Sequence, residues 1–233
     1  MTHSGSRLLA ALLAAILLLA LLPVFGAASP AGVRGSDIIL PPDEFGDPDP
    51  LDGYTDVKAS AWYYSAVKYM VEKGYMGSTS TKVKNFEPGK TLTRAEFVQV
   101  LYKIKGSKVS CANPFADVKA DKWYYDAVLW AYKNGITSGT TASTFSPNEP
   151  VTREQVAQFL YNAYGVGTAA SDRISAFPDG SKVSGWARTA MNWAIQKGII
   201  SGEKHADGSV TLNPKQTATR AELASIIFRM LAK

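Results

Sequence analysis

An all-α fold is predicted for this chain, built of three helix–loop–helix repeats that close round a pseudo-threefold axis. A Thr-Arg pair followed by Glu or Gln opens an apolar helix three times, at intervals of about 60 residues. An apolar stripe with helical spacing, led by tryptophan, precedes each of these motifs. One such helix pair cannot bury its own apolar face, so the three pairs must pack on one another. We favour closure over a linear stack because no repeat shows a polar capping face.

The elements of one repeat can be followed along residues 115–164. A short extended segment precedes a helix that begins near Trp123, and Gly135 ends that helix in the C-cap position. A loop over 137–150, rich in Ser, Thr, Gly and Pro, leads to a second helix that Thr152 caps. The expected inward-facing residues of the two helices are Trp123, Ala127, Val128, Ala131 and Tyr132, then Val156, Phe159 and Leu160.

Each Thr-Arg motif has the form of a capping box. The threonine side chain accepts a hydrogen bond from the amide three residues on, and a Glu or Gln at that position reaches back to the threonine amide. This logic explains the first and last residues of the motif but not the arginine between them. The pairs are Thr93 with Glu96, Thr152 with Gln155, and Thr219 with Glu222.

The arginines are placed unfavourably, because a cation in the first turn faces the positive end of the helix dipole. The same choice made three times indicates an anion nearby, which is either an internal carboxylate or a ligand. Asp56, Asp117 and Asp179 recur in register and are the candidate internal partners; they either cap and turn the backbone or line a groove. The arginines are Arg94, Arg153 and Arg220.

The N-terminal segment is expected to direct export. Residues 1–28 carry one arginine, an apolar run and then small residues, the pattern of a secretory signal cleaved after Ala28. An uncleaved anchor is the alternative, but the run is shorter than the roughly 20 residues that a membrane span needs, so the mature chain is not expected to cross a membrane. Residues 29–53 are predicted to be a Pro- and Asp-rich linker. The predicted repeats are 54–109, 110–170 and 171–233.

Composition argues against several classes of function. The formal net charge is +5, and the basic residues are spread along the chain, so no nucleic-acid site is expected. The single cysteine, Cys111, allows no internal disulfide. His205 stands alone in a variable loop, which argues against a histidine-dependent triad or a metal cluster. The glutamates of the helix starts are already explained as caps or their neighbours, so we expect neither an enzyme nor a cofactor.

Five motifs recur in one order: aromatic-x-Asp, Trp, a Gly-Ile-x-Ser-Gly turn, Phe-x-Pro and Thr-Arg-Ala-Glu. Together they resemble the S-layer homology family over about residues 54–232. The resemblance implies a mainly helical, three-repeat domain that attaches exported proteins non-covalently to the bacterial cell wall and its S-layer. It also implies the ligand, a secondary cell-wall polysaccharide that is acidic and often pyruvylated. Peptidoglycan and surface proteins are the alternative partners.

The resemblance assigns roles to residues at the matching positions. The three arginines are expected to lie in grooves between repeats and to pair with the acidic sugar, helped by free amides at the helix starts. The tryptophans either present a ring face to a sugar or anchor the first helix in the core. The expected binding residues, besides the arginines and aspartates above, are Trp62, Trp123, Trp186, Gly139 and Gly202.

Departures from the motif indicate unequal grooves. Repeat one is one residue shorter at Gly77, and repeat three has a longer loop around His205. Glu154 places a negative charge beside Arg153, which is expected to weaken anion binding there. We therefore expect two working grooves. Alanine at Arg153 or Arg220 is expected to weaken wall binding and leave folding nearly intact. The competing function is a protein–protein interaction or scaffold module at the cell surface that binds no glycan.

Overall fold

The computed structural model describes residues 48–165 and 171–232. The predicted signal segment lies outside the described residues, as does the predicted linker up to residue 47. The remainder of that linker packs on the folded part: Leu51 is buried in the core, and the Asp49 carboxylate accepts hydrogen bonds from the Leu51 amide and, at 2.9 Å, from Lys68. No helix in the described ranges has the length and apolar content needed to cross a membrane.

The predicted mainly helical fold is confirmed. The second helices of the repeats begin at the three arginines, and the first helices begin at Tyr64, Tyr125 and Arg188. In order, the α-helices are α1 Tyr64–Glu72, α2 Arg94–Lys105, α3 Tyr125–Lys133, α4 Arg153–Tyr164, α5 Arg188–Gln196 and α6 Arg220–Leu231. Repeat three adds the 3-10 turns η1 Ile174–Ala176, η2 Gly180–Lys182 and η3 Gly185–Ala187, and the hairpin β1 Glu203–Lys204 with β2 Val210–Thr211.

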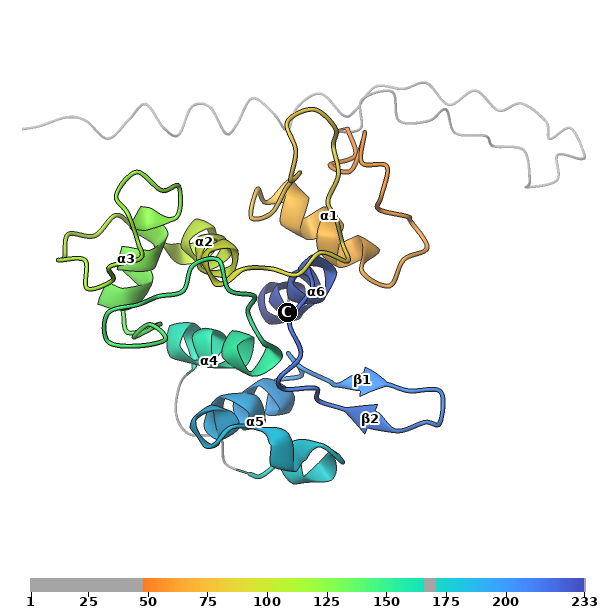
Figure 1. The fold of residues 1–233 in the computed structure, drawn as a ribbon. Helices are drawn as coiled ribbons and strands as arrows, with labels where there is room; N and C mark the ends of the chain where they lie inside the picture. The colour runs from red at the N-terminus through yellow and green to blue at the C-terminus, as the bar shows by residue number, and fades with distance from the viewer. Residues whose placement is uncertain (1–47, 166–170, 233) are drawn as a thin grey trace, which may run out of the picture. The chain divides into compact units, whose positions relative to one another are not determined.

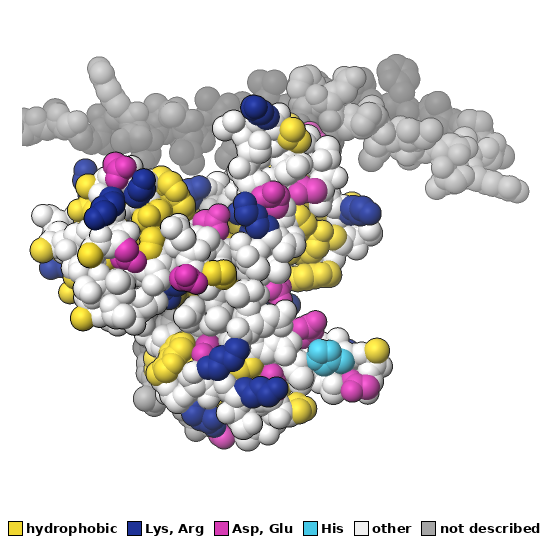
Figure 2. All heavy atoms as spheres, in the orientation of Figure 1, with side chains coloured by type: hydrophobic (Ala, Val, Ile, Leu, Met, Phe, Trp, Pro, Cys, Tyr) yellow, Lys and Arg dark blue, Asp and Glu magenta, His cyan; other side chains and the backbone are white. Residues whose placement is uncertain are grey.

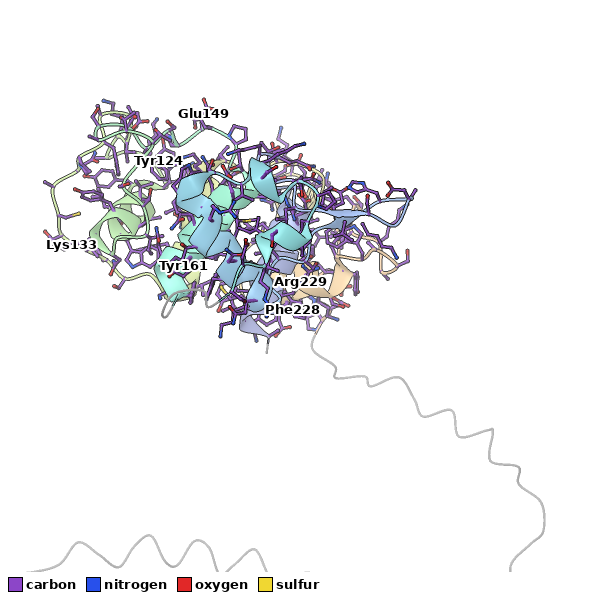
Figure 3. All side chains as sticks on the ribbon, turned by 90° about the horizontal axis from the view of Figure 1, so that it is seen from below. Tyr124, Lys133, Glu149, Tyr161, Phe228 and Arg229 are labelled. Carbon is purple, nitrogen blue, oxygen red and sulfur yellow. The ribbon has the colours of Figure 1, made fainter. Side chains whose placement is uncertain are left out.

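Helices pack between repeats. The second helix of each repeat lies against the first helix of the next: α2 on α3, α4 on α5, and α6 back on α1 (Figure 1). An aromatic pair meets edge to face at each of these junctions, with ring centroids 5.3 to 5.7 Å apart, a geometry that adds to the energy of buried area. The pairs are Tyr69 with Phe228, Tyr102 with Trp130, and Tyr161 with Trp193 (Figure 3 labels Phe228 and Tyr161). The contact of α6 with α1 joins the last repeat to the first, so the repeats close as predicted.

A ring of backbone hydrogen bonds joins the segments that lead into the second helices. The Leu92 amide donates to Ala218 at 3.1 Å, the Ala218 amide to Val151 at 2.9 Å, and the Val151 amide to Leu92 at 2.9 Å. All three residues are fully buried. Each repeat therefore gives one bond and receives one, which is how the backbone groups at the pseudo-threefold axis are satisfied without a sheet.

Two details of the predicted helices are wrong. The first helices begin two residues after Trp62, Trp123 and Trp186, so the tryptophans lie in the preceding turns and not on the helices. Tyr132, predicted to face inward, is 38% exposed near the end of α3. The C-cap prediction holds, since Gly135 has a φ of +69° and a Cβ there would meet nothing within 4 Å. The left-handed backbone alone therefore favours glycine at that position.

Candidate functional site

Three grooves lie at the junctions between repeats, and each draws on all three repeats. A groove contains the arginine of one repeat, the turn and second helix of the next, and the tryptophan of the third. We name them by their arginines. The Arg94 groove has the 136–140 turn, α4 and Trp186; the Arg153 groove has the 200–203 turn, α6 and Trp62; the Arg220 groove has the 75–79 turn, α2 and Trp123. Their volumes are about 560, 290 and 370 Å³ in that order.

The arginines are buried, each between 4% and 7% exposed. In every case Nε donates a hydrogen bond across the junction to a loop carbonyl of the next repeat. The bonds run from Arg94 to Phe145 at 2.9 Å, from Arg153 to Leu212 at 2.8 Å and from Arg220 to Phe86 at 2.5 Å. A backbone carbonyl is thus a partner that the sequence did not indicate. The arginines tie consecutive repeats together.

The prediction that free helix-start amides assist an anion site is wrong. The first two amides of each second helix donate to carbonyls of the neighbouring repeat; for α2, Arg94 donates to Glu149 at 2.9 Å and Ala95 to Pro147 at 3.0 Å. The third amide donates to the threonine of the capping box, which forms at all three helices as predicted. These amides therefore already have partners within the protein. An anion in a groove is therefore not bound by these amides.

The three aspartates hold the loops that receive the arginines. Asp117 accepts hydrogen bonds from the amides of Phe145 at 2.9 Å and Ser146 at 2.7 Å. Ser146 has a φ of +59°, and the equivalent Glu87 and Asn213 also adopt the left-handed region. Such a conformation costs about 1–3 kcal/mol in a residue with a side chain, so the carboxylate offsets local strain. Asp56 and Asp179 make the same pairs of bonds.

An internal salt bridge between these aspartates and the arginines, the alternative to a ligand in the sequence analysis, does not form in the described residues. The ion pair of the Arg153 groove is instead with Glu222, at 3.2 Å from Nη1. Glu222 is also the capping-box residue of α6, and a cap is the only role that the sequence predicts for it. Its pairing with Arg153 cannot be predicted locally, because Arg153 belongs to the neighbouring repeat.

The tryptophans are not core anchors. Trp62, Trp123 and Trp186 are 67%, 61% and 56% exposed, and each borders a groove. Trp123 meets the Tyr124 ring edge to face, at 5.0 Å between centroids. An exposed indole beside a polar hollow is an arrangement that offers a flat apolar surface to a ligand.

The glycines of the turns permit close backbone approach in two of the repeats. Gly139 has a φ of +90°, and a Cβ there would lie 2.4 Å from the Thr144 carbonyl oxygen. Gly202 has a φ of +79°, and a Cβ there would lie 2.7 Å from Val210 Cγ1 and 2.9 Å from the Thr211 carbonyl oxygen. Gly77 of the shorter first repeat does not adopt a positive φ, and its carbonyl accepts a bond from Arg220 Nη2 at 2.7 Å. The turn that borders the Arg220 groove is therefore built differently, in line with its shorter sequence.

Glu154 does not lie in the Arg153 groove. Its buried carboxylate accepts hydrogen bonds from the amide and hydroxyl of Ser184 and forms an ion pair with Lys215 at 2.6 Å. This carboxylate is thus paired with a lysine of repeat three, and the expectation that it weakens anion binding at Arg153 loses its basis.

Charges on the surface are mixed. On the face seen in Figure 2, Lys and Arg alternate with Asp and Glu, and no broad basic area appears. Across residues 48–165 and 171–232, no three His, Cys, Asp or Glu side chains gather closely enough to hold a metal ion. The grooves are the features of this surface that combine a buried cation with an exposed aromatic ring.

Comparison with known proteins gives a consistent result. The family model of the S-layer homology domain matches residues 53–98, 114–157 and 176–224. The chain is 33% identical to the surface-layer 125 kDa protein of Lysinibacillus sphaericus over 75% of its length, and 34% identical to the exoglucanase XynX of Acetivibrio thermocellus over 77%. It is 30% identical to the S-layer protein sap of Bacillus anthracis over 75%. The matched regions make up only 14%, 16% and 20% of these relatives.

Proposed function

This chain belongs to the S-layer homology family, a family of cell-surface modules, and we propose that it anchors non-covalently to an acidic secondary cell-wall polysaccharide. The inter-repeat grooves are the binding sites. The observation that supports this most directly is the repeated pairing of a buried guanidinium with an exposed indole in one hollow. We also propose that the protein is exported and that it binds wall polymer without modifying it.

Each part of a groove has a role in this proposal. The guanidinium recognises the carboxylate of an acidic sugar, such as a pyruvate ketal, because its planar donors match two carboxylate oxygens. The indole covers an apolar face of the sugar ring. The aspartates and the glycines Gly139 and Gly202 act indirectly, by holding the turns and loops that form the walls. The hollows have the size of small-ligand sites, which run to several hundred Å³.

The test uses co-sedimentation of the purified chain with wall sacculi, before and after hydrofluoric acid removes the attached polysaccharide. We expect binding that is lost on stripping. Binding that survives stripping would identify peptidoglycan as the ligand and overturn the proposal. Absence of binding to either preparation would overturn it in favour of a protein partner.

A triple variant in which Trp62, Trp123 and Trp186 are all replaced by alanine tests the role of the indoles. Val83→Ala is its control. Val83 is another exposed apolar side chain, at 52%, but it borders none of the three grooves. Surface substitutions of this kind change stability by about 0.5 kcal/mol or less. We expect the triple variant to lose binding at unchanged stability and the Val83 variant to bind normally. Equal binding of sacculi by the two variants would show that the grooves are not the binding sites.

A further inference from the structure

We propose that the three grooves are not equivalent: the Arg94 groove takes the carboxylate of the acidic sugar, and Gln155 is the residue that makes it selective. This inference rests on the proposed function and refines it. It also differs from the sequence-based expectation of two working grooves.

Arg94 forms no direct ion pair with any residue in the described ranges. It is 4% exposed, its Nε donates to Phe145, and the aromatic rings of Phe145 and Phe159 lie 4.8 and 5.3 Å from the guanidinium carbon. Its Nη2 is buried and has no hydrogen-bond partner. A buried donor without an acceptor is costly, and more so on a charged group. Because Arg94 borders the groove, a small movement of the guanidinium toward a bound anion would give that donor an acceptor.

Electrostatics agree with this geometry. Burial lowers the pKa of Arg94 to about 10, and Asp117 opposes the shift only in part. At pH 7 the side chain is still a cation, so the groove retains a buried positive charge. Burial also lowers the pKa of Arg220, but there the carboxylates of Glu96, Glu87 and Asp56 all act in the opposite direction.

The other two arginines have partners within the protein. Arg153 pairs with Glu222 at 3.2 Å, and this pair is shielded, with side chains 9% and 21% exposed. Arg220 Nη2 donates to the Gly77 carbonyl, and Glu96 borders the same groove. Each of these grooves therefore has a capping-box carboxylate in its lining, together with further charged side chains: Arg229 and Glu203 in the Arg153 groove, Lys90 and Lys103 in the Arg220 groove. The Arg94 groove has no carboxylate in its lining, and its arginine keeps a buried donor without an acceptor, so a carboxylate ligand there meets no like charge beside the guanidinium.

One charge difference between the grooves lies at the last residue of the capping box. Glu96 and Glu222 occupy it in the Arg220 and Arg153 grooves, and Gln155 occupies it in the Arg94 groove. Gln155 still caps α4, because its Oε1 accepts from the Thr152 amide at 3.0 Å. The glutamine thus keeps the helix start intact and removes the competing charge.

A second unpaired atom in the same groove narrows the ligand class. The Oε1 of Gln158 is buried without a partner, while its Nε2 donates to Asn162 at 2.8 Å. The groove therefore offers a donor at Arg94 and an acceptor at Gln158, with the exposed Trp186 at its edge. A sugar with one carboxylate and free hydroxyls meets both needs. A free sulfate ion has acceptors alone and would leave Gln158 unpaired.

The test exchanges the capping residues. Gln155→Glu gives the Arg94 groove the capping carboxylate that the other two grooves have, and Glu222→Gln removes that carboxylate from the Arg153 groove. Both side chains can form the cap, so folding is retained. Affinity is measured for polysaccharide-bearing sacculi and, by titration calorimetry, for methyl glucuronide against methyl glucoside as the neutral probe. We expect Gln155→Glu to weaken binding of sacculi and glucuronide about tenfold, the equivalent of about 1.4 kcal/mol. The neutral glucoside should show no such dependence.

The outcomes distinguish failure of the Arg94 assignment from failure of the proposed function. Unchanged glucuronide and sacculus affinity in Gln155→Glu, with intact binding by the unaltered chain, overturns the assignment and leaves the proposed function standing. The assignment is also overturned if Glu222→Gln weakens binding as much as Gln155→Glu does. If the unaltered chain does not bind sacculi at all, the proposed function fails and the assignment fails with it. Unchanged or stronger binding by Glu222→Gln, with loss in Gln155→Glu, supports the assignment.

Discussion

Replacing Arg153 by alanine is expected to destabilise the fold substantially, contrary to the expectation from sequence. The change removes the hydrogen bond from Nε to the Leu212 carbonyl at 2.8 Å and the pair with Glu222 at 3.2 Å. A hydrogen bond from a charged group contributes about 1.5–3 kcal/mol. The Glu222 carboxylate keeps its bond to the Thr219 amide, so the loss on that side is about 1 kcal/mol. The total is about 2.5–4 kcal/mol.

The matched control is Arg188→Ala. Arg188 also occupies the first position of a helix, α5, but its side chain is 43% exposed and its pair with Asp172 is long, at 3.8 Å. Exposed pairs of this kind contribute about 0–1 kcal/mol. The two variants therefore make the same chemical change at the same helix position and differ in burial and in the contact between repeats.

The assay is thermal and urea unfolding followed by circular dichroism. For a domain of this size, 1 kcal/mol shifts Tm by about 2–4 °C, so Arg153→Ala should lower Tm by about 10 °C and Arg188→Ala by no more than about 4 °C. Equal small shifts would refute the inference that Arg153 ties two repeats together. The result also determines how binding data are interpreted, because a wall-binding loss in an arginine variant carries no information on ligand contact unless the fold is intact.

Single contacts elsewhere in the fold allow three further tests. Asp117→Ala leaves two loop amides without their carboxylate and should cost about 3 kcal/mol in urea unfolding; a loss below about 1 kcal/mol would contradict the role given to it. Gly139→Ala should destabilise the fold far more than Gly135→Ala. Both glycines have a positive φ, but only at Gly139 would the added Cβ clash, at 2.4 Å from the Thr144 carbonyl oxygen. Similar unfolding midpoints for the two variants would contradict this. The pKa of Asp49 is lowered by the Leu51 amide and by Lys68, so its contribution to stability is present above about pH 4 and is lost as the pH falls through the lowered value. Asp49→Asn should therefore be less sensitive than the unaltered chain to acid between about pH 5 and pH 2, measured by Tm against pH.

The repeat architecture could be predicted from sequence because its signals are local. The capping boxes, the glycine at each first-helix end and the inward stripe of Val156, Phe159 and Leu160 depend on residues a few positions apart. Closure was predictable from the lack of a polar capping face. The prediction failed for the tryptophans as helix residues, because an apolar side chain at helical spacing looks the same in sequence whether it is buried or at a rim.

The site was predictable only in part. The arginines, tryptophans and turn glycines could be named from their recurrence, and their glycan-binding role stays a prediction. Gln155, Gln158 and Glu222 were not proposed as groove residues. The glutamine in place of glutamate was visible in the sequence, but its meaning depends on Arg94, which belongs to a different repeat and comes beside it only through folding.

By itself, then, the sequence determined the repeats, their helices and their caps, since each arises from interactions within one turn or one loop. The tertiary structure decided which partners the charged residues at those helix starts have. The partners of Arg153 and Arg220 lie in other repeats, at Glu222 and at Gly77, and Arg94 is left with an unpaired donor. The physical reason is that each groove is assembled from three repeats, so its electrostatic balance is a property of their closure and of no single segment.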